Sequence, residues 1–158
     1  MRREAASAYL RVIMDSTIDR TAQTRPYAPA LERLRGVGLR PTRQRLALAK
    51  LLFDGGDRHI TAEMLHSEAL RARVRVSLAT VYNTLHQFTG AGLLREIVVD
   101  AERSYFDTNV SDHHHMFDEN TRHLLDIAGT DVRVDRLPDL PEGMEVSRVD
   151  LIVRVRKV

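Results

Sequence analysis

The sequence predicts a mixed α+β fold made of a winged helix-turn-helix domain and a smaller α/β domain. Short segments with helical periodicity lie between residues 30 and 89, and a hairpin pattern follows them, which is the element order of a winged helix. Beyond residue 108 the pattern changes to strand alternation. We expect a helical or disordered N-terminal extension over residues 1–29, the winged helix over 30–108 and a dimerisation and ligand-sensing domain over 109–158. The 158 residues suffice for two small domains of this kind.

The expected helices are marked by residues that begin or end them. The first is expected over Ala30–Arg35 and stops at a Gly-Val-Gly segment. Thr42, Thr61 and Ser77 each precede a helical stretch and can accept a hydrogen bond from a free amide of its first turn, as N-cap residues do. The helix after Ser77 is expected over Leu78–Thr89. It places four apolar residues on one face: Leu78, Val81, Leu85 and Phe88.

Strands are expected in both parts of the chain. Leu93–Val99 and Arg103–Asp107 form a predicted hairpin, and His113–Phe117 and Arg122–Ile127 flank a second polar turn. Alternation from Val149 onward predicts a last strand near the C-terminus. The second domain has only about 50 residues, which is too few for a large core, so we expect it to pair with a second copy of the chain.

Composition excludes several classes of protein. Cysteine is absent, which excludes disulfides, thiolate zinc sites, iron–sulfur clusters and thiol catalysis, and fits a reducing cytosol. No apolar run approaches the roughly 18 residues of a membrane span. The first residues lack the apolar core of a signal peptide. We therefore expect a cytoplasmic protein with no membrane partner.

Charge is distributed unevenly along the chain. Residues 1–95 hold 16 Lys and Arg against 8 Asp and Glu, whereas residues 96–158 hold 8 against 14. A basic first part suits a polyanion, and an acidic second part suits cations or a protein partner. Chance segregation of charge in a short chain is the alternative.

The helix expected over Leu78–Thr89 has an outer face that suits DNA. That face is small, polar and free of acidic residues: it holds Ala79, Thr80, Asn83 and Gln87, with Tyr82 and His86 on its flanks. Asn and Gln can bind adenine in the major groove, and the methyl groups of Thr and Ala can contact thymine. Six arginines are expected near phosphates: Arg40, Arg43, Arg45, Arg71, Arg73 and Arg75. A solvated amphipathic helix among arginine-rich loops is the alternative.

Three of the seven histidines are consecutive, His113 to His115, on a predicted strand. Alternation sends His113 and His115 to one face of that strand and His114 to the other. Neutral imidazole is a common ligand of zinc, manganese, iron and haem iron. Asp107 and His123 are near enough in sequence to complete a shell. A solvated histidine-rich loop is the alternative.

His59 lies at the start of the expected third helix, in the other domain. If His59 shared a cation with the histidine cluster, the ion would fix the angle between the two domains, which is a physical basis for a switch. On spacing alone, His59 fits a hydrogen-bonding residue at the start of a helix as well as it fits a ligand.

Five short motifs stand out in the chain: Arg40-Pro-Thr-Arg-Gln-Arg, His59-Ile-Thr-Ala-Glu, Ser77-Leu-Ala-Thr-Val-Tyr-Asn-Thr-Leu, Ala91-Gly-Leu and His113-His-His. Together they resemble the ferric uptake regulator superfamily, from Leu31 to the C-terminus. Within this superfamily the chain resembles one branch, the haem-linked iron response regulators. The resemblance rests on two features: the chain lacks Cys-x-x-Cys pairs, and it contains the segment Asp107-Thr-Asn-Val-Ser-Asp-His-His-His.

The resemblance implies a homodimeric repressor that binds a pseudo-palindromic operator in double-stranded DNA. Tyr82 matches the family's base-contacting tyrosine, and Arg40 matches the basic residue that approaches the minor groove. Asn83 stands where many members have arginine, which changes the expected operator. The implied DNA-binding residues are Arg40, Ser77, Ala79, Thr80, Tyr82 and Asn83.

The resemblance also implies a regulatory metal site between the domains. This site maps onto His59, Asp107 and His114, with Asp126 as an approximate further carboxylate. The expected ligand is haem or a divalent metal, which would be iron, manganese or zinc.

A second metal site of the family maps onto His113 and His115. Its remaining ligands fall near Arg133 and Val149, which bind no cation, so the site is incomplete unless His123 substitutes. The family's structural zinc site cannot exist without cysteine. These departures favour haem, or a remodelled metal site, as the signal.

The function expected from these observations is that of a transcription regulator of iron or haem homeostasis whose operator affinity depends on haem or a divalent metal. The runner-up is a regulator of the same superfamily that senses manganese, zinc or peroxide. A metal-dependent hydrolase ranks lower, because the sequence has no His-Glu-x-x-His or similar paired spacing. A metal-storage or scaffold protein is a further alternative and predicts no affinity for DNA.

Overall fold

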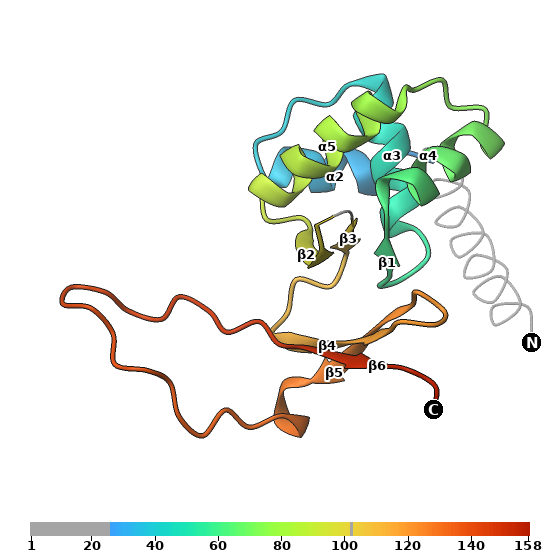
Figure 1. Cartoon of the computed structure of the whole chain (residues 1–158). Coiled ribbons are helices and arrows are strands. Elements are labelled where there is room, and N and C mark those ends of the chain that lie inside the picture. Colours follow the sequence, from blue (N-terminus) through green and yellow to red (C-terminus); the bar gives the residue numbers. More distant parts are fainter. Residues whose placement is uncertain (1–25, 102) are drawn as a thin grey trace, which may run out of the picture.

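The computed structural model of the chain describes residues 26–101 and 103–158 (Figure 1). Helices form one end of the molecule, a small sheet lies next to them, and a second sheet forms the other end. Most of the extension expected over residues 1–29 lies outside the described residues. In chain order the elements are α2 (Ala28–Gly36), α3 (Arg43–Phe53), β1 (His59–Ile60), α4 (Ala62–Arg71), α5 (Leu78–Gly90), β2 (Arg95–Asp100), β3 (Arg103–Asp107), β4 (His113–Asp118), β5 (Leu124–Ala128), the 3-10 turn η1 (Gly129–Asp131) and β6 (Ile152–Val155).

Three of the four described α-helices begin at the predicted N-cap residues. The side-chain oxygens of Thr42, Thr61 and Ser77 each accept a hydrogen bond from the backbone amide three residues later, at 3.1–3.3 Å. These bonds satisfy amides that have no partner inside the helix. Helix α2 begins two residues earlier than expected, because Pro29 fits the first helical turn, where its missing N–H is not needed.

The helices enclose the main hydrophobic core. Its fully buried side chains come from every described α-helix and from the first sheet: Leu34, Leu48, Leu65, Leu85, Phe88, Ile60 and Phe106. Within α5 the inward stripe consists of Val81, Leu85 and Phe88 as predicted, together with Thr84, while Leu78 is only partly buried. None of the described helices is both long and apolar enough to cross a membrane.

The first sheet is antiparallel and has the strand order β1-β3-β2. The hairpin β2–β3 confirms the predicted wing. The sequence does not predict strand β1: His59 is expected at the start of a helix, and two residues are too few to show alternation. Its pairing sets His59 directly opposite Asp107.

The β2–β3 hairpin contributes side chains to two hydrophobic cores. Phe106 packs in the helical core with Leu94, the residue before β2, whereas Ile97, Val99 and Tyr105 pack against the second sheet. The domain boundary expected at residue 108 falls just after β3, where the chain passes from the first sheet to the second. The two parts are therefore joined by packing as well as by the chain.

The second sheet has the strand order β5-β4-β6, with β4 antiparallel to β5 and parallel to β6. Phe117 and Leu124 form its core with the hairpin side chains, and Ile152 packs against them. The alternation from Val149 places Val153 on the apolar face of the last strand and makes Ile152 the exception. The structure shows the reverse, because the register with β4 sets Ile152 opposite His115 and leaves Val153 36% exposed.

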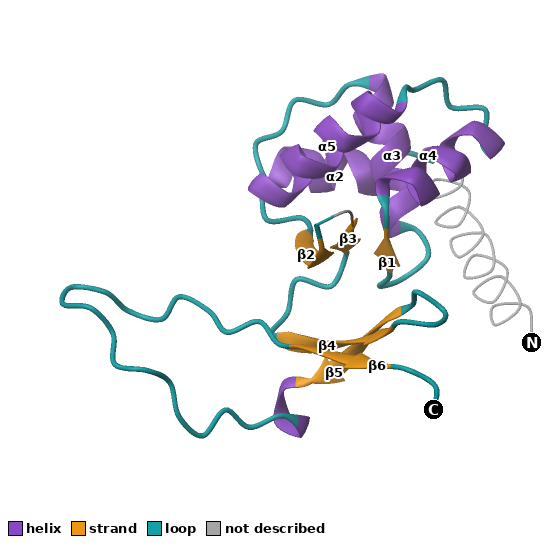
Figure 2. Cartoon of the chain, viewed as in Figure 1, coloured by secondary structure: helices purple, strands orange, loops and turns teal. Residues whose placement is uncertain are grey.

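Residues 132–151 form a long loop without helix or strand (Figure 2). In the sequence, Asp131–Leu137 fits either a brief helix or a loop. In the structure this segment is loop, and the 3-10 turn η1 ends at its first residue. Pro138 and Pro141 oppose regular structure here, since each lacks a backbone N–H. The loop exposes five apolar side chains: Val134, Leu137, Leu140, Met144 and Val146.

Candidate metal centre and nucleic-acid interface

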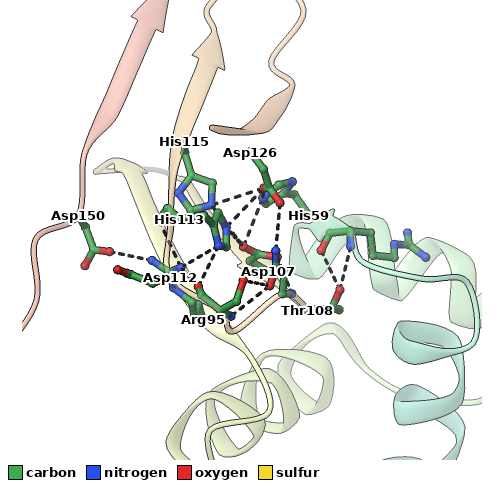
Figure 3. Close-up of polar contacts among 12 residues, drawn as sticks. His59, Arg95, Asp107, Thr108, Asp112, His113, His115, Asp126 and Asp150 are labelled. Carbon is green, nitrogen blue, oxygen red and sulfur yellow. Dashed lines mark hydrogen bonds and ion pairs between the residues drawn. The ribbon is translucent and has the colours of Figure 1, made fainter. Parts of the chain in front are cut away.

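Five metal-ligating side chains converge between the two sheets (Figure 3). They are His59 of β1, Asp107 of β3, His113 and His115 of β4, and Asp126 of β5, and their ligand atoms all lie within 4.8 Å of one another. Strand pairing accounts for the convergence, since His59 is opposite Asp107 in one sheet and His115 is opposite Asp126 in the other. We call these five residues the His/Asp cluster.

Asp107 is the centre of the His/Asp cluster. Its Oδ2 lies 2.8 Å from Nε2 of His113, 3.3 Å from Nε2 of His115 and 3.4 Å from Nε2 of His59. Nε2 of His113 is also 3.1 Å from Nε2 of His115. The same nitrogen of all three imidazole rings therefore points to one place.

Burial and hydrogen bonding act in opposite directions on Asp107. Its complete burial on its own would raise the pKa of the carboxyl group. The hydrogen bond from His115, the neighbouring His59 imidazole and the backbone amide of Asn109 outweigh burial and hold the pKa of Asp107 well below its usual range. Asp107 is therefore a carboxylate at neutral pH and available to a cation.

The remaining contacts test whether the cluster fits a metal ion. Nε2 of His59 is buried and lies 2.9 Å from Oδ1 of Asp126, yet it makes no aligned hydrogen bond with any described group. A buried nitrogen without a partner is costly, and a cation at the centre of the cluster would give it one. Three imidazoles and two carboxylates, with no sulfur, suit iron(II), manganese(II) or zinc. The residues fit a single divalent cation.

The structure does not bring the two other predicted ligands into the cluster. His114 lies on the opposite face of β4, and its Nδ1 is buried with no hydrogen-bond partner among the described residues. His123 is exposed in the β4–β5 turn and lines a cavity of about 470 Å³ with Tyr82 and Glu63. His114 and His123 as metal ligands remain predictions.

The predicted grouping of histidines needs correction. The resemblance placed His114 with His59 and Asp107 and assigned His113 and His115 to a separate site. The structure places His113 and His115 with His59 and Asp107 instead. The cause is the alternation of β4, which turns the two outer histidines of the trio toward the first sheet.

Sequence reasoning missed Arg95, which lies beside the cluster. It is the first residue of β2, is paired with Asp107, and is only 9% exposed. An arginine at a strand position that alternates with buried apolar residues was the available signal, because arginine is rarely buried without a partner.

The outer face of α5 leaves most of its predicted DNA-binding residues in solvent. Ala79, Tyr82 and Asn83 are exposed, and so is Gln87. Thr80 is half-buried, and its hydroxyl lies 2.9 Å from that of Ser77 at the start of the helix. The structure thus presents to solvent the face expected to enter a groove.

Two of these side chains already have partners within the chain. The Tyr82 hydroxyl donates to Oε1 of Glu63 at 2.6 Å. This hydrogen bond lowers the pKa of Glu63 and raises the pKa of Tyr82, because the carboxylate stabilises the protonated phenol. Oε1 of Gln87 accepts two hydrogen bonds from the Arg45 guanidinium, at 2.7 and 3.0 Å.

Exposed arginines lie on the helical part of the chain outside α5. Arg43, Arg73 and Arg75 line one hollow of about 430 Å³, which has no acidic residue in its lining. Arg40 and Arg71 are also exposed. Among the described residues, none of these five guanidinium groups forms an ion pair with a carboxylate. Such groups are available to phosphates.

The chain is similar to known proteins over most of its length. The sequence model of the ferric uptake regulator family matches residues 36–153. The ferric uptake regulation protein of Pseudomonas aeruginosa is 31% identical over 126 residues, which is 78% of this chain and 94% of that protein. The peroxide operon regulator of Bacillus subtilis is 35% identical over 120 residues, which is 75% of this chain and 81% of that protein.

A solved structure agrees with these sequence matches. The ferric uptake regulator of Pseudomonas aeruginosa, determined with manganese, superposes with a TM-score of 0.63 at 28% identity and covers 81% of this chain and 97% of that one. The family match extends from the end of α2 into β6, and so includes every residue of the His/Asp cluster and all of α5. The chain belongs to the ferric uptake regulator family.

Proposed function

We propose that the protein is a DNA-binding transcription regulator whose operator affinity is set by one divalent cation, iron or manganese, in the His/Asp cluster. The observation that supports this most directly is the origin of the five ligands. His59 and Asp107 come from the sheet packed on the helices, and His113, His115 and Asp126 come from the second sheet.

The positions of these residues suggest how metal binding changes DNA affinity. A bound cation would supply the positive charge that holds the two carboxylates and three imidazoles together. His59 lies two residues before Thr61, the N-cap of α4, and α4 packs against α5. The ligands of the second sheet would therefore hold the helices at one angle. One angle of α5 suits a pair of operator half-sites better than a range of angles.

The cluster favours a bare cation over haem. Haem iron takes one or two axial ligands from the protein, whereas five donors converge here. The haem-linked signal of the iron response regulator branch would have to use a histidine outside the cluster, of which His114 has the buried ring nitrogen without a partner. Iron or manganese is therefore our first proposal and haem the second.

A homodimer is part of the proposal. The loop over residues 132–151 exposes five apolar side chains on the second domain, and a second copy of the chain would cover them. Two copies related by a two-fold axis would place two α5 helices on successive half-sites of a pseudo-palindromic operator.

The proposal is tested by DNA binding with and without Mn²⁺. An operator is selected from random duplexes in the presence of Mn²⁺, and fluorescence anisotropy then compares it with a scrambled duplex at fixed ionic strength. We expect preference for the operator with Mn²⁺, its loss on chelation, and its loss in His113→Gln. His66→Gln is the control: His66 lies on α4 outside the cluster, where its ring contacts the Val76 carbonyl, and the variant should bind as wild type. Equal affinity for both duplexes under all conditions contradicts the proposal.

A further inference from the structure

Arg95 occupies a fixed position beside the His/Asp cluster. In the first sheet His59, Asp107 and Arg95 form one row across β1, β3 and β2, so their side chains lie on the same face. Two of the three belong to the cluster, and the third carries a permanent positive charge at 9% exposure. The positive charge of Arg95 beside a cation site opposes metal binding by electrostatic repulsion. Its position there therefore needs an explanation.

The guanidinium of Arg95 contacts a cluster ligand directly (Figure 3). Its Nη1 lies 3.2 Å from Nδ1 of His113 and donates to the carbonyl of Ser111 at 2.8 Å. Its Nη2 donates to Oδ1 of Asp150 at 2.8 Å, and Arg148 donates to the same oxygen at 2.8 Å. Asp150 thus holds Arg95 in place against His113.

Nδ1 of His113 has two possible partners that exclude each other. It lies 3.2 Å from Arg95, which can only donate, and 2.9 Å from the Ser111 carbonyl, which can only accept. Accepting from Arg95 requires the ring proton on Nε2, from where it is donated to Asp107 at 2.8 Å. Donating to Ser111 requires the proton on Nδ1. Only this second tautomer leaves the lone pair of Nε2 free for a metal ion.

We propose that Arg95 lowers the metal affinity of the cluster by holding His113 in the tautomer that cannot bind metal. In the metal-free protein, hydrogen bonds run from Arg95 to His113 and from His113 to Asp107. Metal binding at Nε2 must break both: Nε2 gives up its proton to solvent, and Nδ1 takes up a proton that it donates to the Ser111 carbonyl. Arg95 thereby sets the metal concentration at which the protein responds, an inference that rests on the proposed function.

The tautomer of His113 can be measured directly. Long-range ¹H–¹⁵N spectra of histidine-labelled protein distinguish the two forms, and His113→Gln identifies the signal. We expect the Nε2–H form in metal-free wild-type protein and the Nδ1–H form both with Zn²⁺ bound and in metal-free Arg95→Met. An Nδ1–H tautomer in metal-free wild type overturns the inference, whether or not Arg95→Met folds.

Metal affinity supplies the second measurement. Arg95→Met removes the competing donor, so affinity for Mn²⁺ should rise by about tenfold, the effect of one hydrogen bond to a charged group. Arg148→Met is the matched control, because it removes the other guanidinium on Asp150 without touching His113, and its affinity should equal that of wild type. If Arg95 only supports the fold, Arg95→Met weakens Mn²⁺ binding instead, which refutes the inference. If wild type itself binds no Mn²⁺, the proposed function fails, and the metal-free spectra still test the Arg95 contact.

Discussion

Phe117 is the side chain on which the second sheet depends, and Phe117→Ala tests that dependence. The ring is fully buried, and its centroid lies 6.1 Å from that of Tyr105 on the hairpin. The guanidinium groups of Arg154 and Arg122 lie 5.6 and 6.0 Å from the centroid of the Phe117 ring. Truncation of a buried Phe costs about 3–5 kcal/mol, and each cation–π contact contributes about 0.5–1 kcal/mol. We expect a loss of about 4 kcal/mol or more.

Urea denaturation of metal-free protein, followed by circular dichroism, measures this loss. Phe117→Leu keeps a buried apolar side chain but loses both cation–π contacts, so it should cost about 1–2 kcal/mol. Val98→Ala, at a position 62% exposed on β2, should change stability by less than about 0.5 kcal/mol. Because a marginally stable protein has only about 5–15 kcal/mol in total, Phe117→Ala should unfold at much lower urea concentrations.

Manganese should restore part of that stability. Phe117 follows His115 by two residues on β4, so unfolding of the second sheet also disperses the metal ligands. A ligand at 100 times its dissociation constant stabilises the native state by about 2.7 kcal/mol. Phe117→Ala with excess Mn²⁺ should therefore regain about that amount. A loss below about 1 kcal/mol in metal-free protein, or tight Mn²⁺ binding by unfolded Phe117→Ala, refutes the reasoning.

Three further predictions concern the DNA-binding face. Arg45 donates two hydrogen bonds to Oε1 of Gln87, so Gln87 has only its N–H donors left for bases in the groove. Arg45→Met frees this oxygen and should change the base preference at one operator position by about 1–3 kcal/mol, measured by binding-site selection. Arg73→Met should weaken binding to all duplexes alike and reduce the slope of log K against log salt by about 0.9 if Arg73 contacts one phosphate; an unchanged slope contradicts that contact. Because the Glu63 pKa is lowered and the Tyr82 pKa is raised, their hydrogen bond stabilises the fold only while Glu63 is ionised and Tyr82 protonated. Denaturation of wild type and Tyr82→Phe should thus differ most between about pH 5 and pH 9 and converge as Glu63 protonates in acid or Tyr82 ionises in base.

Local sequence signals predicted the helix starts and the orientation of the histidines. Thr42, Thr61 and Ser77 are caps because their hydroxyls satisfy amides within three residues, a property of the local chain alone. The common face of His113 and His115 likewise follows from the two-residue period of a strand. Such features do not depend on what the segment packs against.

The sequence pattern could not predict features that depend on tertiary packing. Strand β1 exists because His59 and Ile60 pair with β3, and two residues carry no period. Whether His113 or His114 joins His59 depends on which face of β4 meets the first sheet. The position of Ile152 depends in the same way on the register of β6 with β4.

The shared hairpin has a consequence for dividing the protein into fragments. A fragment that ends at residue 108 would retain the helices but expose Ile97, Val99 and Tyr105, which are each at most 5% exposed in the whole chain. The truncated protein would then present a bare apolar sheet face and should self-associate or precipitate. An isolated DNA-binding fragment therefore requires polar replacements at these three positions.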